Sequence, residues 1–99
     1  MKVQRDITVM NPNGLHARPA MQLVEVANGF GCDITITRAA GEDESEPTVA
    51  DAKSVMQVIT LAATQGTPLH LCAEGDDAEP AAAAIADLFD SGFGEMDGE

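Results

Sequence analysis

Tryptophan and tyrosine are both absent from this chain, and its only aromatic side chains are Phe30, Phe89 and Phe93. Basic residues are also scarce: five lysines and arginines stand against seventeen aspartates and glutamates, for a formal net charge of -12. Few rings leave little for nucleic-acid bases to stack on, and an acidic surface repels nucleic-acid phosphates and anionic lipid headgroups. We therefore expect no nucleic-acid binding and no attachment to a membrane surface.

Cysteines and long apolar runs are also in short supply. Cys32 and Cys72 are too few for a disulfide framework and do not form a Cys-x-x-Cys pair. No apolar run approaches the roughly 20 residues of a membrane span, and the first residues lack the apolar segment of a secretory signal. We therefore expect a cytoplasmic protein. With 99 residues, 44% of them hydrophobic, the chain predicts one domain, 1–99, with 93–99 as a loose tail.

Hydrophobic periodicity predicts seven elements in the order β-α-β-β-α-β-α. Apolar and polar residues alternate in the expected strands, whereas the expected helices have apolar residues at helical spacing. The strands fall at about 7–9, 34–37, 48–50 and 69–73, and the helices at 17–27, from 54, and from 77 to Gly92. The connections are too short for a parallel doubly wound sheet, so we expect an α+β fold with an antiparallel sheet and helices on one face.

The chemistry concentrates at His16, which follows the turn residues Asn13-Gly14-Leu15 and begins the first expected helix. A helix start offers unpaired N–H donors and a partial positive charge, so anions bind there. Arg18 could add a charge-assisted contact, and imidazole is both a good nucleophile and, once protonated, a good leaving group. These properties suit reversible phosphoryl transfer. The alternative is that His16 merely caps the helix.

Two stretches in register resemble one known family. The residues Asn13-Gly14-Leu15-His16-Ala17-Arg18-Pro19-Ala20 resemble the active-site motif of HPr, the histidine-containing phosphocarrier of the phosphoenolpyruvate-dependent phosphotransferase system. The residues Asp51-Ala52-Lys53-Ser54-Val55-Met56 resemble that family's regulatory serine segment, and Gln65-Gly66 and Ala73-Glu74-Gly75 also fit. The resemblance covers nearly the whole chain.

The resemblance implies an open-faced β-sandwich, with a four-stranded antiparallel sheet and three helices on one face. It implies that His16 accepts a phosphoryl group on Nδ1 from phosphorylated enzyme I and passes it to an EIIA-type domain. Arg18 then stabilises the phosphate, and Ser54 is the target of an HPr kinase/phosphorylase. No cofactor or metal is implied, and the protein is expected to be a monomeric carrier rather than an enzyme.

A docking surface for partners is expected beside His16. We expect Val55 and Met56 at the surface and Val58 inside. An exposed patch that contains methionine can adapt to several partners. Ala17, Met21 and Ile59 would complete this surface. A serine at position 54 also has a purely structural explanation, since Ser54 and Gln57 have the spacing of a capping box.

The chain departs from the family in its charges. Family members often carry basic residues around the docking surface, where this chain has Glu25, Asn28 and Gln57. Steering toward an acidic partner would be weak or reversed. The acidic loop 41–47 is longer than usual and is interpreted as an inserted hairpin connection. His70 and Cys72 share a strand face, for which a polar sheet surface is a sufficient explanation.

Two other functions remain open at this point. A regulatory module would be phosphorylated on His16 or Ser54 yet would bind a transcription factor or kinase, without serving sugar transport. A stand-alone enzyme using His16 as nucleophile would need a pocket and further acid–base groups, for which a chain this short has little room.

Overall fold

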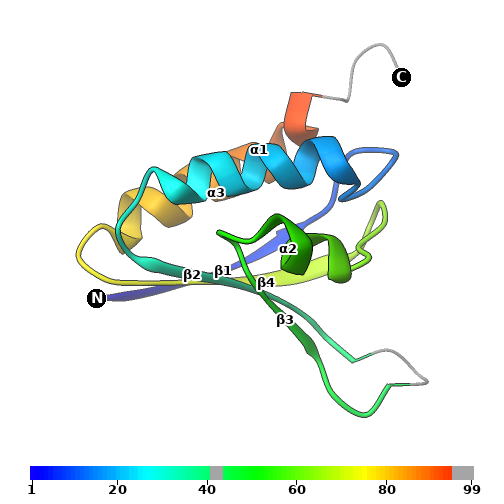
Figure 1. Ribbon diagram of the computed structural model, residues 1–99, viewed down its shortest axis with the longest axis horizontal. Coiled ribbons are helices and arrows are strands. Elements are labelled where there is room, and N and C mark those ends of the chain that lie inside the picture. Colours follow the sequence, from blue (N-terminus) through cyan, green and yellow to red (C-terminus); the bar gives the residue numbers. More distant parts are fainter. Residues whose placement is uncertain (41–43, 95–99) are drawn as a thin grey trace.

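The computed structural model describes residues 1–40 and 44–94, and it contains the expected order of strands and helices. Figure 1 shows their arrangement. The elements are β1 (Lys2–Thr8), α1 (Ala17–Asn28), β2 (Asp33–Arg38), β3 (Thr48–Asp51), α2 (Val55–Thr60), β4 (Pro68–Glu74), α3 (Ala78–Asp90) and a short 3-10 turn, η1 (Gly92–Gly94).

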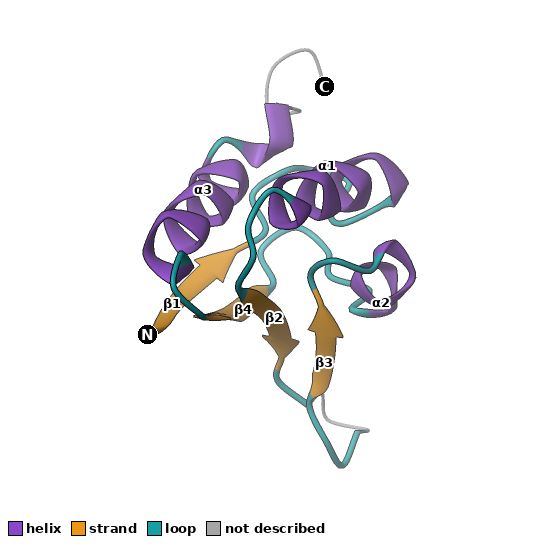
Figure 2. Ribbon diagram, turned by 60° about the vertical axis from the view of Figure 1, so that its left-hand side comes forward, coloured by secondary structure: helices purple, strands orange, loops and turns teal. Residues whose placement is uncertain are grey.

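The four strands form one sheet in the order β1-β4-β2-β3, and every neighbouring pair is antiparallel. All three helices lie on one face of this sheet, and the other face is left open (Figures 1 and 2). The predicted four-stranded antiparallel sheet with helices on one face is therefore confirmed. Among the helices of the described ranges, none is long and apolar enough to cross a membrane.

The core lies between the sheet and the helices, and it follows the alternation of the strands. Leu69 and Leu71 of β4 point inward and are buried, whereas His70 between them faces the open side. Helix α3 contributes Ile85 and Phe89, both fully buried. Each such side chain contributes about 1.5–3 kcal/mol through removal of its apolar surface from water. This core holds the helices in fixed positions on the sheet.

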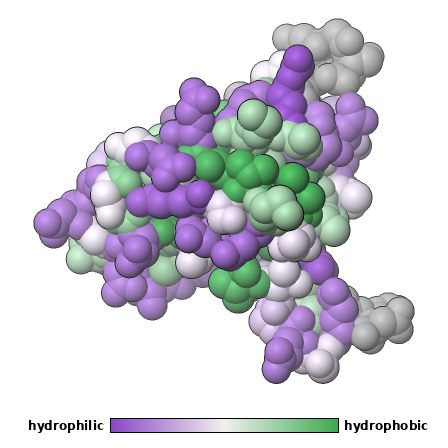
Figure 3. Space-filling view, viewed as in Figure 1, coloured by the Kyte–Doolittle hydropathy of each residue, from purple (hydrophilic) through white to green (hydrophobic). Residues whose placement is uncertain are grey.

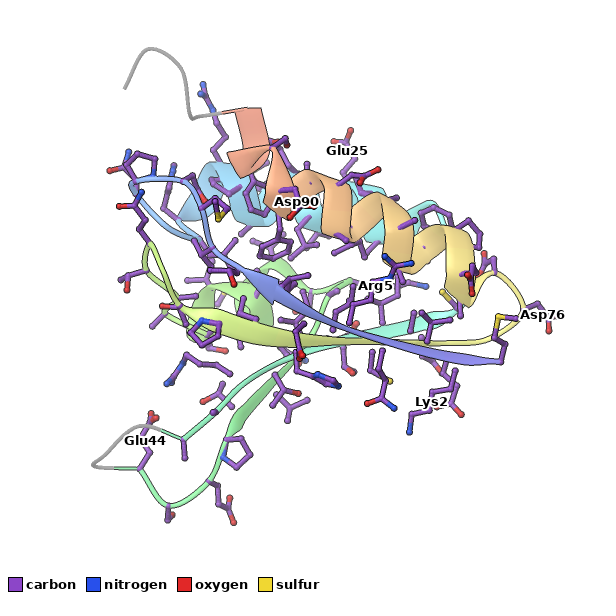
Figure 4. The ribbon with its side chains drawn as sticks, turned by 180° about the vertical axis from the view of Figure 1, so that it is seen from behind. Lys2, Arg5, Glu25, Glu44, Asp76 and Asp90 are labelled. Atoms are coloured by element: carbon purple, nitrogen blue, oxygen red, sulfur yellow. The ribbon has the colours of Figure 1, made fainter. Side chains whose placement is uncertain are left out.

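Strand β1 begins at Lys2, five residues earlier than the alternation Ile7-Thr8-Val9 predicts. The reason is its place at the edge of the sheet, where it pairs only with β4. An edge strand with one solvated face carries few buried side chains, so its pattern is weak in the sequence. Figure 4 shows Lys2 and Arg5 on this strand. Val9 lies just beyond it and donates its N–H to the Thr67 carbonyl (3.0 Å).

The C-terminal end differs from the expected loose tail at Phe93 and Gly94. Phe93 is only 3% exposed, and its ring meets that of Phe89 edge-on, with the centroids 4.8 Å apart. Gly92 has a positive φ of 64° and ends the helix as predicted, so that the chain turns back onto α3. Residues 95–99, the rest of the predicted tail, lie outside the described residues.

We expect Phe93→Ala to lower the free energy of unfolding by about 3–5 kcal/mol, because it removes a buried ring and leaves a cavity beside Phe89. Urea denaturation followed by circular dichroism measures this loss. Asp90→Asn, an exposed change on the same segment, serves as the control and should stay within about 0.5 kcal/mol. A loss below about 1 kcal/mol for Phe93→Ala would show that this residue does belong to a loose tail.

Candidate functional site

The segment that leads into α1 is held against the segment that follows α2. Leu15 donates its N–H to the Ala63 carbonyl (2.9 Å), and Gly66 donates its N–H to the Val9 carbonyl (2.8 Å). Within the first segment, the buried Asn11 side chain donates from Nδ2 to the Gly14 carbonyl (2.8 Å). These contacts fix the backbone on both sides of the turn immediately before His16.

Gly14 is required by the close approach of these two segments. Its φ is +68°, and a Cβ at this position would lie 2.4 Å from the Ala63 carbonyl oxygen and 2.9 Å from the Thr64 Cα. Both are backbone atoms, which cannot turn aside as a flexible side chain would. A glycine is thus the only residue that allows the loop to pack here and to adopt the left-handed conformation.

His16 is the N-cap residue of α1, with extended backbone angles (φ −80°, ψ −170°). Its carbonyl accepts the first helical hydrogen bond, from the Ala20 N–H (3.0 Å), but its side chain makes no capping hydrogen bond. His16 therefore caps the helix through its backbone alone, and the residue is exposed. His16 thus stands at the exposed start of α1.

The first turn of α1 forms the surroundings of the histidine. Ala17 and Arg18 carry N–H groups with no acceptor inside the helix, whereas Pro19 has none to leave unpaired. Helix α1 has no acidic residue in its first turn, so nothing there cancels the positive end of the helix dipole. The exposed Arg18 side chain belongs to the same turn. This arrangement suits a dianionic group carried on the imidazole.

Apolar side chains are exposed on α1 and α2, and we call them the α1–α2 patch: Ala17, Met21, Val55, Met56 and Ile59. Met21 is 60% exposed, Met56 77% and Ile59 41%, while Val55 is half-buried. Figure 3 shows a band of hydrophobic side chains over the region where Figure 1 places these two helices. The expected split is confirmed for Met56 at the surface and Val58 inside, but Val55 is half-buried because it packs against the core. Exposed apolar groups gathered in this way mark an interaction surface.

Ser54 is the N-cap residue of α2, and its hydroxyl accepts a hydrogen bond from the Gln57 N–H (3.3 Å). The second half of the predicted capping box does not form as expected. The Gln57 side-chain oxygen accepts from the Asp51 N–H (2.9 Å), while the Ser54 N–H donates to the Asp51 carbonyl (3.0 Å). Gln57 thereby ties the end of β3 to α2, and Ser54 remains half-exposed at the helix start.

Lys53 connects the two helices of the patch in a way that sequence patterns did not reveal. Its Nζ donates to the carbonyl of Phe30, just beyond the end of α1 (2.8 Å). A lysine at the C-terminal end of a helix satisfies an unpaired carbonyl and complements the helix dipole. Because Lys53 precedes Ser54 directly, this bond positions the start of α2 against α1.

Asp77 also has a structural role that sequence patterns did not predict. It lies at the start of α3 as expected, but its carboxylate caps no helix N–H and instead accepts from the N–H groups of Gly31 (2.8 Å) and Cys32 (2.9 Å). The hydrogen bond from Gly31 contributes most, and together these bonds hold the pKa of Asp77 below its usual value. Burial, with a contribution from Asp77, raises the pKa of the Cys32 thiol. Cys32 is buried, and its N–H takes part in fixing the chain to the start of α3.

His70 and Cys72 lie on the open face of the sheet, whereas α1, which begins at His16, lies on the other face. The His70 ring is held by Asp6 (Nδ1 to Oδ1, 3.1 Å) and Gln4 (Nε2 to Oε1, 2.8 Å) on the neighbouring strand. A hollow of about 400 Å³ opens beside it, with Thr37, Pro47 and Pro68 in its lining. Among residues 1–40 and 44–94, no three side chains of the His, Cys, Asp and Glu types gather as metal ligands.

The acidic loop connects β2 and β3, which form an antiparallel hairpin as expected. Glu44 pairs with Arg38 through both carboxylate oxygens (3.0 and 3.1 Å), and the Arg38 Nε donates to the Leu61 carbonyl (2.7 Å). Residues 41–43 of the predicted loop lie outside the described residues. Arg38 thus fastens the base of the hairpin to the end of α2.

Known proteins resemble this chain over nearly its full length. A family model described as "PTS HPr component phosphorylation site" matches residues 3–91. The chain belongs to the HPr family of phosphotransferase-system phosphocarriers. Phosphocarrier proteins of this family carry phosphoryl groups rather than act as enzymes in the usual sense.

Individual relatives agree with this assignment. The phosphocarrier protein HPr of Pseudomonas putida is 38% identical, over 92% of this chain and 94% of that protein. The phosphocarrier protein NPr of Escherichia coli K12 is 36% identical, over 96% of this chain and 99% of that protein. The crystal structure of HPr-C-His from Thermoanaerobacter tengcongensis has a TM-score of 0.80 and 38% identity, with 95% of this chain and 98% of that chain covered. This confirms the open-faced sandwich.

Larger proteins contain a similar region. The multiphosphoryl transfer protein of Salmonella typhimurium is 38% identical over 90 residues, which are 91% of this chain. This chain therefore spans only 23% of the length of that relative.

We expect Gly14→Ala to destabilise the protein by about 2–4 kcal/mol, because it combines backbone strain with a clash against Ala63 and Thr64. Gly66→Ala is the matched control: Gly66 has a φ of +90° but no atom within 4 Å of a built Cβ. It should therefore show the strain alone, about 1 kcal/mol. Thermal and urea unfolding measure the loss of stability in both variants. Equal losses would show that the clash with Ala63 and Thr64 adds nothing to the backbone strain.

Proposed function

We propose that this protein accepts a phosphoryl group on His16 from phosphorylated enzyme I and passes it to an EIIA-type acceptor. The observation that supports this most is the exposed His16 ring at the positive end of α1, inside a chain that matches the phosphocarrier family from residue 3 to residue 91. The protein works as a monomer in the cytoplasm and needs no cofactor.

In the first transfer step, the Nδ1 atom of His16 is the nucleophile. Nδ1 attacks the phosphorus of the donor, so that an N–P bond forms while the bond between phosphorus and the donor breaks. The N–H groups of Ala17 and Arg18 and the Arg18 guanidinium then stabilise the oxygens of the transferred group. In the second step the acceptor attacks the same phosphorus, and the imidazole leaves once its ring is protonated.

The α1–α2 patch is the proposed docking surface for both partners. It begins at Ala17, next to the reacting histidine, and continues over two helices whose relative position is fixed by the core and by Lys53. The two exposed methionines, Met21 and Met56, can change rotamer to fit different partners. One surface can thereby serve a donor and an acceptor in turn, which a carrier requires.

Ser54 is the proposed site of regulation by an HPr kinase/phosphorylase. Its hydroxyl is half-exposed at the start of α2 and directly precedes Val55 and Met56 of the patch. A phosphate here would have to lose part of its hydration whenever a partner covers the patch. Phosphorylation of Ser54 therefore weakens docking while leaving His16 itself unchanged.

We expect His16→Ala to abolish labelling by radioactive phosphoenolpyruvate in the presence of the source organism's own enzyme I, because Nδ1 is the only acceptor of the group. His70→Ala, which removes the other histidine from the open face of the sheet, serves as the control and should label as the wild type does. Undiminished labelling of the His16 variant would contradict the assignment.

We expect Ser54→Asp to lower the second-order rate constant of phosphoryl transfer from enzyme I by about tenfold, because it adds a charge beside an apolar contact. Ser54→Asn is the matched control, since asparagine caps a helix as well as aspartate does but carries no charge. Stopped-flow or quench measurements give both rates. An equal effect of the two substitutions would mean that Ser54 acts only as the helix cap.

A further inference from the structure

The exposed face of α1 carries one negative charge, that of Glu25. Ala17, Met21, Glu25 and Asn28 follow one another at spacings of four, four and three residues, and all four are exposed. Residues at such spacings lie along one stripe of a helix. Glu25 is therefore the next side chain after Met21 along the α1–α2 patch, one turn farther from His16. Figure 4 shows it pointing away from the sheet into solvent.

A second exposed carboxylate, that of Asp51, lies near α2, the other helix of the patch. Asp51, the exposed last residue of β3, lies just before α2 and accepts a hydrogen bond from the Lys53 N–H through its Oδ1 (2.9 Å). The ammonium group of Lys53 itself is directed to the Phe30 carbonyl and is partly buried there. Lys53 is thus used inside the molecule, while the carboxylate of Asp51 faces outward.

The other basic residues do not offset this charge at the patch. Arg38 is bound to Glu44 and to the Leu61 carbonyl. Lys2 and Arg5 belong to β1, at the edge of the sheet opposite β3, against which α2 packs. Of the five basic residues of the chain, only Arg18 is exposed beside the patch, directly after Ala17. In the proposed transfer, the positive charge of Arg18 stabilises the oxygens of the phosphoryl group.

We propose that the protein surface that docks on the α1–α2 patch carries a lysine or arginine opposite Glu25, and that Glu25 is a specificity-determining residue. This inference rests on the proposed docking of a phosphoryl donor on the patch. A carboxylate at the rim of an apolar contact raises the association rate with a basic partner and lowers it with an acidic one. With a net charge of -12, the whole molecule adds to this selection at low ionic strength.

The test compares phosphoryl transfer from the source organism's own phosphorylated enzyme I to the wild type, Glu25→Gln and Glu25→Lys. Each second-order rate constant is measured at low and at high salt. Asp90→Asn is the matched control, because it removes one negative charge from the exposed end of α3 outside the patch. Glu25 is an exposed helix residue, so both of its variants should fold, which circular dichroism checks.

We expect transfer at low salt to fall about threefold in Glu25→Gln and about tenfold in Glu25→Lys, with little change in Asp90→Asn. High salt should bring the variants close to the wild type, because the lost interaction is between exposed charges. Equal or faster transfer to Glu25→Lys would overturn the inference while leaving the carrier function intact. Absence of label even in the wild type would overturn the proposed function and the inference with it.

Discussion

The close approach of the backbone at Gly14 to the backbone at Ala63 and Thr64 is the constraint on which the site depends. It brings together the chain just before α1 and the chain just after α2, and the hydrogen bond from Leu15 to Ala63 closes the contact. Since two backbones touch without a side chain between them, there is little freedom to shift one against the other. The start of α1 is thereby placed at a fixed position beside the end of α2.

Two features of a phosphocarrier follow from this placement. The first is an exposed histidine at the positive end of a helix, where N–H donors can receive a phosphoryl group without a pocket. The second is an apolar surface beside it, built from two helices that the Lys53 bond to Phe30 also holds together. In the proposed function, the chain supplies the acceptor atom and the docking surface, while its partners supply the rest of each active site. Such a role needs no enclosed pocket within the 99 residues of the sequence.

Local sequence patterns predicted the order of elements, the antiparallel sheet and the position of His16 at a helix start. They failed where the decisive partner lies far along the chain. Asp77 resembles a helix cap in sequence, but its carboxylate binds the backbone at Gly31 and Cys32, more than forty residues away. Phe93 follows a helix-ending glycine and resembles a tail, yet its contact with Phe89 buries it. Such contacts depend on how packed elements meet, which periodicity does not encode.

In the proposed function, the first turn of α1 binds the phosphoryl group carried by His16. Two-dimensional ¹H–¹⁵N NMR before and after phosphorylation by enzyme I and phosphoenolpyruvate tests it most directly. We expect large downfield shifts of the Ala17 and Arg18 amide protons, which would then donate to phosphate oxygens, with little change at His70 on the open face of the sheet. A phosphorylated protein whose Ala17 and Arg18 amide signals do not shift would show that the first turn of α1 does not bind the phosphoryl group.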